Sequence, residues 1–429
     1  MIQQSVSVYR SLSLSKPVDI LILSNGPGEV TTWVLPVVKA LRAKFGDNRD
    51  LVRISVVLSP CPHASGKEEA IASSFPEVDR VQSPDYFLTF LIKGKTRNNW
   101  DWRSQGLVIF LGGDQFFALL IARRLRYSSL VYAEWDARWL SWLTHFALGQ
   151  DSVASKIPPK YRHKCTVVGN LMADLGDIYP LSPSTELIGL LPGSKSAKLA
   201  QGVPFSLAIA EAIASQRPQT RFILPLAPTL TPEALARFAS AETNPLVAKL
   251  EGMGGELIST PEGYFLVSPQ GVKIELVTRF PAFDLLSQCS LCLTTVGANT
   301  AQLGSLGVPM LVLIPTQQLD AMRAWDGIPG ILANLPLLGH YFATVINWLI
   351  LRQKRLFAWP NLWAKSEIVP ELVGELSARA IAQQVLDLLD NPTELAKIHD
   401  NLTQFRPQPG AATRLVDIIN LENNKNHHN

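Results

Sequence analysis

Residues 18–29 read Val-Asp-Ile-Leu-Ile-Leu-Ser-Asn-Gly-Pro-Gly-Glu, a short apolar run that ends in small and turn-forming residues. Such a run, without regular alternation, is typical of a parallel strand covered on both faces. Similar runs recur through the N-terminal half, with helix-like segments between them. The runs lie at 54–58, 107–111, 130–132 and 166–168, and the helical segments include 31–45 and 116–126. This order of strands and helices predicts a doubly wound α/β domain.

The pattern begins again after the turn-rich stretch 180–184, which we interpret as an inter-domain linker. The new apolar runs lie at 187–191, 221–226, 273–277, 290–294 and 310–314, and helical segments include 205–215 and 231–240. A chain of 429 residues is also long for a single core. We therefore predict two tandem Rossmann-like, doubly wound domains that face a cleft, over 17–180 and 185–405, followed by a tail over 406–429.

The composition narrows the classes of function. The 39 basic and 36 acidic residues nearly balance and include no long Lys/Arg tract, which disfavours nucleic-acid binding. Apolar residues make up 47% of the chain and charged residues only 17%, which fits a protein that rests against an apolar surface or has large inter-domain contacts. Cys289 and Cys292 have no second Cys or His pair at zinc-ligand spacing, so we expect buried thiols and no metal.

No segment predicts secretion or a membrane span. The Ser-rich start lacks the apolar core of a signal peptide, and the apolar run 341–351 is shorter than the roughly 20 residues that cross a bilayer. We expect a cytoplasmic protein, soluble or peripheral on the inner face of a membrane. Around this run, Trp348, Phe357, Trp359 and Trp363 are interleaved with Arg and Lys. This mixture suits anionic headgroups, or equally a domain–domain contact that buries the same residues.

Apolar runs of both halves end in glycine-bearing loops. In the loop at 24–29, Gly26 and Gly28 let a ligand approach the backbone, and the following helix offers unpaired N–H groups; the alternative is a tight turn. In the loop at 190–196, backbone amides, the Ser194 hydroxyl and the charge of Lys195 form a cradle for a diphosphate, unless this is an ordinary turn.

A third such loop lies at 294–302, where Gly297 again allows close approach and Thr300 can cap the next helix. Aromatic residues mark a fourth segment, in which Trp135, Trp139 and Trp142 would share one face of a helix. A stripe of this kind packs in a core more often than it binds a ligand.

Residues 360–372 read P-N-L-W-A-K-S-E-I-V-P-E-L, which resembles the late P-N-L-x-A-x-x-x-V-P-E-L signature of lipid-A-disaccharide synthases. L-P-G-S at 191–194 is similar to a second motif of that family. The likeness runs from about residue 18 to 405 and is moderate outside these motifs. It implies the GT-B glycosyltransferase fold, which sugar-nucleotide 2-epimerases and glycogen phosphorylases share, so that fold alone does not choose a function.

The resemblance implies which residues bind a nucleotide. In the family an Arg follows L-P-G-S, and Lys195 takes its place here. The small-residue loop at 294–302 corresponds to one that meets the nucleotide phosphates, and Gln302 stands in register with a Glu that holds the ribose. The implied nucleotide-binding set is Gly193, Ser194, Lys195, Gly297, Ala298, Asn299, Thr300 and Gln302.

Acidic residues supply the candidates for chemistry. An inverting transfer needs a base that takes the proton of the acceptor hydroxyl, and our candidate is Asp114, just past the run 107–111. The alternative is that Asp114 caps the helix that it precedes. The family's motif has two acidic positions in this region. Asp114 falls between them and aligns with neither.

The resemblance also places the first loop on the acceptor side of the cleft. We assign Glu29 a catalytic role there, and Gly26 and Gly28 a substrate-binding role. Glu134 and Asp136 are candidates for contacts with sugar hydroxyls, or for a fallback base. Residues 168–174 resemble the family's V-G-H-P-L-A-D, with Asn170 and Leu171 in place of His and Pro, and are expected to shape a hinge.

These observations predict an enzyme, a metal-independent inverting hexosyltransferase without a cofactor. It would move a sugar, such as an N-acetylglucosamine unit, from a UDP-sugar to a lipid-linked acceptor, and a homodimer is possible. Two alternatives remain. One is a sugar-nucleotide 2-epimerase of the same fold, although no His is well placed for it. The other is a catalytically weakened protein that binds nucleotide sugars or glycolipids, which Lys195, Gln302 and the displaced Asp114 suggest.

Overall fold

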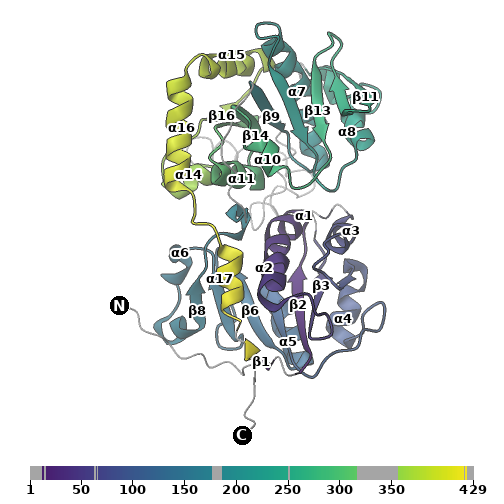
Figure 1. Ribbon diagram of the computed structural model, residues 1–429, viewed down its shortest axis with the longest axis vertical. Helices are drawn as coiled ribbons and strands as arrows, with labels where there is room; N and C mark the ends of the chain where they lie inside the picture. Colours follow the sequence, from purple (N-terminus) through teal and green to yellow (C-terminus); the bar gives the residue numbers. More distant parts are fainter. Residues whose placement is uncertain are drawn as a thin grey trace, which may run out of the picture. The chain divides into compact units, whose positions relative to one another are not determined.

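A computed structural model describes residues 16–61, 64, 66–175, 186–249, 252–315 and 356–419, and the backbone of β1 (Leu12–Ser13) and β17 (Leu421–Glu422), which pair with each other. The chain divides into two units (Figure 1). Unit 1 comprises Met1–Gly176 and Pro407–Asn429, and unit 2 comprises Asp177–Arg406. The linker predicted at 180–184 lies outside the described residues.

Unit 1 is built on a seven-stranded parallel sheet of order β4-β3-β2-β5-β6-β7-β8. Its strands are β2 (Val18–Ser24), β3 (Val52–Leu58), β4 (Arg80–Gln82), β5 (Gly106–Phe110), β6 (Ser128–Ala133), β7 (His145–Leu148) and β8 (Cys165–Val167). The strand order reverses between β2 and β5, and doubly wound sheets bind ligands in the crevice at such a point, beside the loops that follow the two strands. The sequence misses β4 and β7, which are short.

Helices cover both faces of this sheet. Short helices α1 (Pro27–Glu29) and η1 (Val30–Val34) lead into α2 (Leu35–Phe45), which packs on one face. The other face is covered by α4 (Phe87–Lys93) and α5 (Gln115–Leu125). Smaller elements join the strands: α3 (Glu68–Ser73), η2 (Pro84–Tyr86), α6 (Asp151–Ala154), η3 (Pro159–Lys164) and η4 (Leu171–Ala173).

The last helix, α17 (Ala411–Asp417), belongs to unit 1, whereas the sequence predicted a tail over 406–429. Its buried Ala411 and Leu415 join the core beside α2 (Figure 1, yellow beside purple). Asp174 accepts hydrogen bonds from the N–H groups of Gly410 (3.1 Å) and Ala412 (2.7 Å), which caps the helix. The motif at 168–174 thus anchors the end of the chain.

Unit 2 repeats the design with an eight-stranded sheet of order β11-β12-β13-β10-β9-β14-β15-β16. Here the strand order reverses between β9 and β14. The strands are β9 (Leu187–Leu191), β10 (Arg221–Pro225), β11 (Glu256–Thr260), β12 (Gly263–Val267), β13 (Lys273–Val277), β14 (Leu291–Thr295), β15 (Met310–Pro315) and β16 (Glu371–Gly374). All pairs are parallel except the β11–β12 hairpin and its pairing with β13, which the sequence did not predict.

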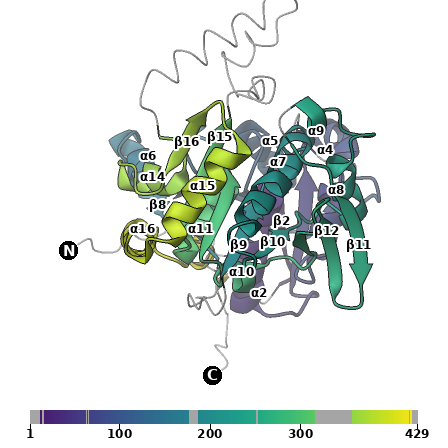
Figure 2. The same ribbon diagram turned by 90° about the horizontal axis from the view of Figure 1, so that it is seen from above.

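Two long helices, α7 (Ser196–Ala214) and α15 (Ala378–Leu389), lie side by side on one face of the unit 2 sheet (Figure 2). The remaining helices are α8 (Pro232–Ala239), α9 (Leu246–Lys249), α10 (Phe283–Leu286), α11 (Ala298–Leu306), α14 (Trp359–Ala364) and α16 (Pro392–Phe405). Cys289 and Cys292 are fully buried free thiols, as predicted.

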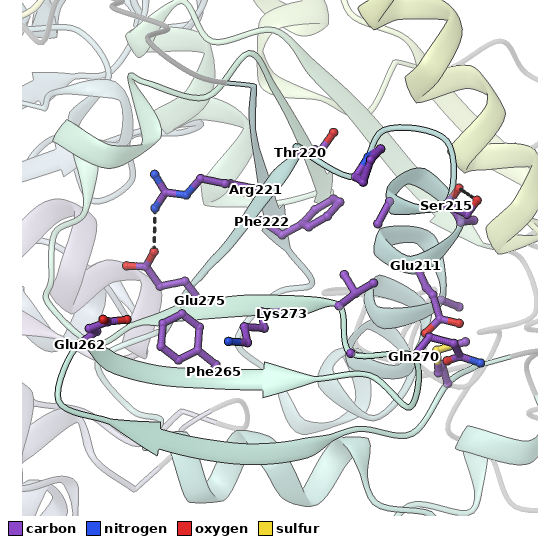
Figure 3. Close-up of a pocket in the computed structure, with 17 residues that line it drawn as sticks. Glu211, Ser215, Thr220, Arg221, Phe222, Glu262, Phe265, Gln270, Lys273 and Glu275 are labelled. Carbon is purple, nitrogen blue, oxygen red and sulfur yellow. Dashed lines mark hydrogen bonds and ion pairs between the residues drawn. The ribbon is translucent and has the colours of Figure 1, made fainter.

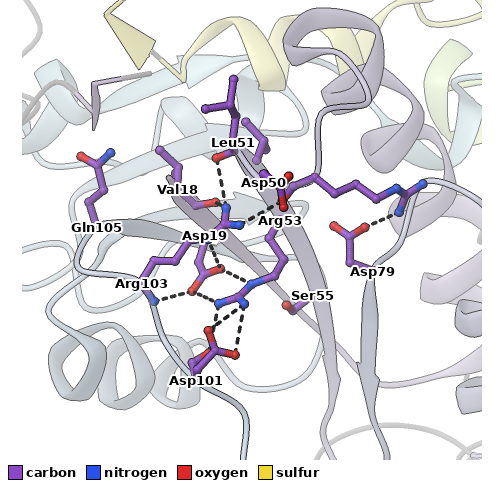
Figure 4. A network of polar contacts seen from close by, with 12 residues as sticks. Val18, Asp19, Asp50, Leu51, Arg53, Ser55, Asp79, Asp101, Arg103 and Gln105 are labelled. Atoms are coloured by element: carbon purple, nitrogen blue, oxygen red, sulfur yellow. Dashed lines mark hydrogen bonds and ion pairs between the residues drawn. The ribbon is translucent and has the colours of Figure 1, made fainter. Parts of the chain in front are cut away.

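A buried ion-pair network fastens the amino ends of the unit 1 strands (Figure 4). Asp19, fully buried on β2, accepts two hydrogen bonds from the guanidinium of Arg53 (2.7 and 3.0 Å) and one from the hydroxyl of Tyr127 (3.0 Å). Arg53 also pairs with Asp101 at 2.9 Å. Because ligands of doubly wound sheets bind at the opposite, carboxyl edge, we assign this network to stability.

Candidate functional site

The crevice of unit 1 is formed by the loops that follow β2 and β5. Gly113 has φ 96°, a conformation that favours glycine, and a Cβ there would lie 2.7 Å from the Ser59 hydroxyl. A Cβ at Gly112 would lie 2.8 Å from Asn25 Oδ1 and 3.3 Å from Glu29 Cγ. Only glycines therefore allow the β5 loop to close on the β2 loop.

Polar atoms in this crevice lack partners. Ser24 Oγ, Asn25 Oδ1 and Glu134 Oε1 are buried, and none of them has a hydrogen-bond partner among the described residues. Buried polar groups are nearly always hydrogen-bonded in proteins. A group of such atoms at the point where the strand order reverses therefore indicates a place for a polar ligand.

Glu134 lies just after β6, and its carboxyl group has a strongly shifted pKa. Burial raises the pKa of Glu134 to about 7; a hydrogen bond involving Trp135 opposes this rise, and the negative charge of Glu29 adds a smaller one. A carboxylate with this pKa is half protonated near neutral pH. It can therefore accept or release a proton under physiological conditions.

In the loop after β2, Gly26 and Glu29 contact each other, whereas Gly28 is exposed. A Cβ at Gly26 would collide with the carboxylate of Glu29, so Gly26 and Glu29 are in direct contact. Gly28 is exposed and faces open space, and its carbonyl oxygen accepts hydrogen bonds from the hydroxyls of Thr31 (3.1 Å) and Thr32 (2.8 Å). The loop thus offers Glu29 to the crevice and leaves Gly28 open to a ligand.

Asp114 and Asp136 are held by partners of their own, one at a helix start and both at Arg138. Asp114 Oδ1 accepts a hydrogen bond from Phe116 N (2.8 Å) and caps α5, the alternative raised by the sequence. Its Oδ2 lies 3.8 Å from Arg138 Nη1, and Asp136 lies 3.3 Å from Arg138 Nε. Both side chains are about half exposed. Their geometry favours capping and surface ion pairing over proton transfer in a buried site.

The segment after β6 differs from the helix that its aromatic stripe suggested. Residues 134–142 form no helix, and Trp139 has φ 60°. Trp135, Trp139 and Trp142 are 52%, 40% and 53% exposed, so the expectation that they pack in a core is wrong. Their periodicity is a coincidence of spacing in a loop that contains a turn at 140–142.

In unit 2 the corresponding loops follow β9 and β14, and Lys198 connects them. Lys198 Nζ donates a hydrogen bond to the Val296 carbonyl oxygen (2.8 Å), and a Cβ at Gly193 would lie 2.9 Å from Lys198 Cδ. Burial, and then the positive charge of Lys195, lower the pKa of Lys198 to about 8. Ser194 and Lys195 are exposed at the start of α7.

Sequence reasoning missed Lys198, which stands one helical turn after Lys195 and is the cation that this site buries. The spacing of three residues was the available signal, because it puts both side chains on the same side of a helix start. Two helices, α7 and α11, begin at these loops. Their N-termini present unpaired N–H groups and partial positive charge, an arrangement suited to an anion.

The third loop contains residues of two kinds. Gly297 has φ 146° and precedes α11, with Ala298, Asn299 and Gln302 half-buried on the helix. Thr300 is fully buried: its hydroxyl donates to Gly297 O (2.8 Å) and accepts from Trp359 N (3.2 Å). The predicted nucleotide contact of Thr300 is therefore replaced by a structural role, since its only hydroxyl is already engaged on both sides.

The signature at 360–372 holds the edge of the unit 2 sheet. Asn361, fully buried, accepts hydrogen bonds from Ile368 N (2.7 Å) and Val369 N (2.9 Å), and donates to Val369 O (2.9 Å). Glu371 begins β16 and accepts from Phe357 N (3.0 Å) and Ala358 N (2.7 Å). The motif is thus structural.

The aromatic residues of the signature pack within unit 2. A Cβ at Gly304 of α11 would lie 2.7 Å from Pro360 Cγ and 3.0 Å from Trp363 Cζ3. Trp359 and Trp363 are half-buried, with ring centroids 6.3 Å apart. This packing favours an internal contact of Trp359 and Trp363 over contact with a membrane surface. The rest of the segment predicted to meet a membrane, residues 341–355, lies outside the described residues.

A separate cavity of about 1070 Å³ lies in unit 2 between the end of α7 and the β10–β13 strands (Figure 3). It is lined by Glu211 of α7, by Ser215 just after that helix, and by Arg221, which pairs with Glu275 at 3.3 Å. Arg221 and Lys273 stand at the amino ends of their strands. The cavity is therefore at the opposite edge of the sheet from the β9 and β14 loops.

Two absences hold for the described part of the chain. Its residues contain no group of three or more His, Cys, Asp or Glu side chains suited to hold a metal ion. Nor do they include a helix that is both long and apolar enough to cross a bilayer.

The fold and these sites can be compared with known proteins. No family model matches the chain. A lipid-A-disaccharide synthase of Geobacter metallireducens is 23% identical over 245 residues, which cover 56% of this chain and 50% of that protein. One of Trichlorobacter lovleyi is 27% identical over 167 residues, 37% of this chain and 36% of that protein. The matched region thus spans half the length of these relatives or less.

Among solved structures, a putative UDP-N-acetylglucosamine 2-epimerase from Listeria monocytogenes has a similar fold. The TM-score is 0.51 at 14% identity, over 96% of this chain and 100% of that chain. The predicted fold class, two Rossmann-like α/β units of the GT-B type, is confirmed. The chain is a divergent relative of the lipid-A-disaccharide synthases, as the signature indicated.

Proposed function

We propose that this protein is an inverting glycosyltransferase that moves a sugar from a UDP-sugar to a lipid-linked sugar acceptor, without a metal ion. The curated relatives, named lipid-A-disaccharide synthases, support a transfer of this class. The observation that carries the proposal is a buried carboxylate oxygen of Glu134, in the crevice of unit 1, that has no hydrogen-bond partner among the residues the structure describes. We place the reaction on the cytoplasmic side of a membrane.

Glu134 replaces Asp114 as the proposed base. Its carboxylate takes the proton of the acceptor hydroxyl while that oxygen bonds to the anomeric carbon of the donor. The bond between this carbon and the diphosphate oxygen breaks, and UDP leaves with the electron pair. Burial, with a smaller contribution from the negative charge of Glu29, keeps the pKa of Glu134 raised, as a base that works near neutral pH requires.

The leaving diphosphate is assigned to unit 2. The N–H groups at the starts of α7 and α11 and the ammonium of Lys198 would stabilise its charge. Gly193, Ser194, Lys195, Gly297, Ala298, Asn299 and Gln302 remain proposed contacts of the nucleotide. Thr300 supports them from inside the helix.

The test is a transfer assay with purified full-length protein, UDP-N-acetylglucosamine or acylated derivatives of it, and a membrane lipid extract. We expect UDP release coupled to a labelled lipid product. Glu134→Gln should lower turnover about 10²- to 10⁴-fold, the usual worth of a general base, and leave UDP binding unchanged. Asp136→Asn, in a neighbouring exposed carboxylate, is the matched control and should keep near-wild-type turnover.

The other outcomes identify the alternatives. Conversion of the sugar nucleotide into its 2-epimer, with no lipid product, would make the protein an epimerase. Tight UDP binding without any turnover would make it a binding protein. If Asp114→Asn abolishes turnover while Glu134→Gln retains it, Asp114 is the base after all.

A further inference from the structure

Two neighbouring helices of unit 1 carry large apolar side chains on their outer faces. On α4, Phe87 and Phe90 are fully buried in the core, whereas Leu88 and Ile92 are 59% and 68% exposed. Leu88 and Ile92 are one helical turn apart and share a face. A helix that packs only on a core would carry polar residues at these positions.

Helix α5 repeats this arrangement. Its residues Leu119 and Ile121 are buried against the sheet, while Phe116 is 36% exposed. Leu120, Arg123 and Arg124 follow Phe116 at four, seven and eight residues, which places them on the same face. A groove of about 580 Å³ joins the two helices and is lined by Leu91, Ile92, Leu120, Arg123 and Arg124.

The loop after β6 extends this surface with two tryptophans. Trp139 lies against Phe116, with ring centroids 5.1 Å apart, and against Trp142, at 6.0 Å. The guanidinium of Arg123 lies 4.5 Å above the ring of Trp142. Exposed apolar and aromatic groups therefore lie on α4, on α5 and on the tryptophan loop, with Arg123 and Arg124 between them. Scattered exposed apolar residues are normal, but a cluster of them indicates a partner.

The charge of this surface indicates which partner. Helices α4 and α5 together contain Lys93, Arg123 and Arg124 and no acidic residue. Tryptophan is enriched where a membrane meets water, because one part of its ring system is apolar and its N–H is polar. Cations beside apolar side chains add an attraction to anionic headgroups.

We propose that α4, α5, Trp139 and Trp142 form a docking surface that binds an anionic lipid bilayer. Helix α5 begins directly after the Gly112-Gly113 loop, and the tryptophan loop begins at Glu134. The docking surface therefore borders the crevice, so that a glycolipid could reach Glu134 without leaving the membrane surface. This last point rests on the proposed function, whereas the docking does not.

The test measures partitioning of the full-length protein onto phosphatidylcholine vesicles with or without phosphatidylglycerol, by co-sedimentation at low salt. We expect binding to the anionic vesicles that weakens as salt is added. The double variant Arg123→Gln/Arg124→Gln should weaken vesicle binding about 25-fold, because each cation near the surface contributes about fivefold to the affinity. Leu88→Ser/Ile92→Ser should weaken it by about tenfold or more, through loss of buried apolar area.

Matched controls lie in unit 2. Arg237→Gln/Arg379→Gln removes two exposed arginines, and Ile258→Ser replaces an isoleucine that is 41% exposed on β11. Both should bind vesicles like the wild type, and circular dichroism should show that all variants fold. Bromine-labelled acyl chains should quench the tryptophan fluorescence of the wild type, and quench Trp139→Phe/Trp142→Phe much less.

The proposal is overturned if the wild-type protein ignores anionic vesicles, or if the α4 and α5 variants bind like the controls. It is also overturned if sedimentation velocity shows a dimer that Leu88→Ser/Ile92→Ser dissociates, because the surface is then an interface between copies of this chain. Vesicle binding needs no UDP-sugar, so a failed transfer assay leaves this result intact.

Discussion

Asn361 donates its side-chain N–H to Oε1 of Glu371 over 2.7 Å, and this bond closes the signature segment on itself. The amide also spans Ile368 and Val369, and the carboxylate also holds Phe357 and Ala358. The Asn and Glu of the motif are thus fixed by the backbone groups that they satisfy. Their ten-residue separation returns the chain from α14 to β16 at the sheet edge.

Asn361→Ala should therefore destabilise unit 2. The substitution leaves two backbone N–H groups, one carbonyl and one carboxylate oxygen without their buried partner, at a cost of about 2–4 kcal/mol. Urea unfolding followed by circular dichroism measures this. Leu362→Ala, at a 41% exposed position of the same helix, should cost less than about 0.5 kcal/mol. Equal losses in both variants would contradict the role of Asn361.

Glu134 should make unit 1 less stable as the pH rises. The pKa of about 7 in the folded protein lies above the ordinary 4.5, so folding favours the protonated form. The corresponding stability is fully present below the ordinary pKa and is lost as the pH rises through 7. Glu134→Gln should remove this dependence and exceed the wild type by about 3 kcal/mol above that range. Urea unfolding on both sides of neutrality measures the difference; parallel curves would contradict it.

Lys198 should make UDP binding pH-dependent. Because the pKa of Lys198 is lowered to about 8, the ammonium loses its charge as the pH rises through that value, and affinity for the diphosphate should fall. Titration calorimetry at several pH values measures this. Lys198→Gln should bind about tenfold more weakly and without this pH dependence.

The variant Lys195→Gln tests whether the charge of Lys195 affects the pKa of Lys198. Removing the positive charge of Lys195 raises the pKa of Lys198, so the pH at which affinity falls should move upward. An unchanged midpoint would mean that the two ammonium groups do not share one site.

Helix α17 should be needed for the stability of unit 1. Leu415 is fully buried against α2, and Leu415→Ala should cost unit 1 about 2–5 kcal/mol. Thr413→Ala, at an exposed position of the same helix, should be nearly neutral. Limited proteolysis and thermal unfolding report the difference. A chain that ends at Arg406 and keeps wild-type stability in unit 1 would refute this role.

The Asp19 network predicts a larger effect than surface ion pairs give. Asp19→Ala leaves the guanidinium of Arg53 without its buried partner and should cost about 3–5 kcal/mol. Asp417→Ala, which removes an exposed pair with Lys44 (3.2 Å), should cost at most about 1 kcal/mol. Thermal unfolding of the two variants gives the comparison.

Much of the fold could be predicted from the sequence because parallel strands of doubly wound sheets are locally recognisable. The runs that became β2 and β9 are largely apolar and lead into glycine-bearing loops, since both faces are covered and the next loop turns sharply. The β11–β12 hairpin escaped because it lies at an exposed edge, and its first strand Glu256–Thr260 has no continuous apolar run.

The site was only partly predictable, for a physical reason. The sequence shows that Asp114 and Glu134 each follow a strand, but not which carboxylate is buried. Burial depends on loops from distant strands, and the pKa of Glu134 depends on the charge of Glu29, more than a hundred residues earlier. The packing of α17 on unit 1 could not be predicted for the same reason. Its apolar residues show that it packs against something, but not that the partner is the face of α2.

The position of α17 has a consequence for synthesis on the ribosome. Unit 2 is complete once Arg406 has emerged, whereas unit 1 still lacks α17, whose residues follow those of unit 2. Multidomain chains generally fold from the N-terminus as they are made. In this chain the unit that is begun first is completed only after unit 2, and the apolar face of α2 that α17 covers stays exposed until residues 411–417 have emerged.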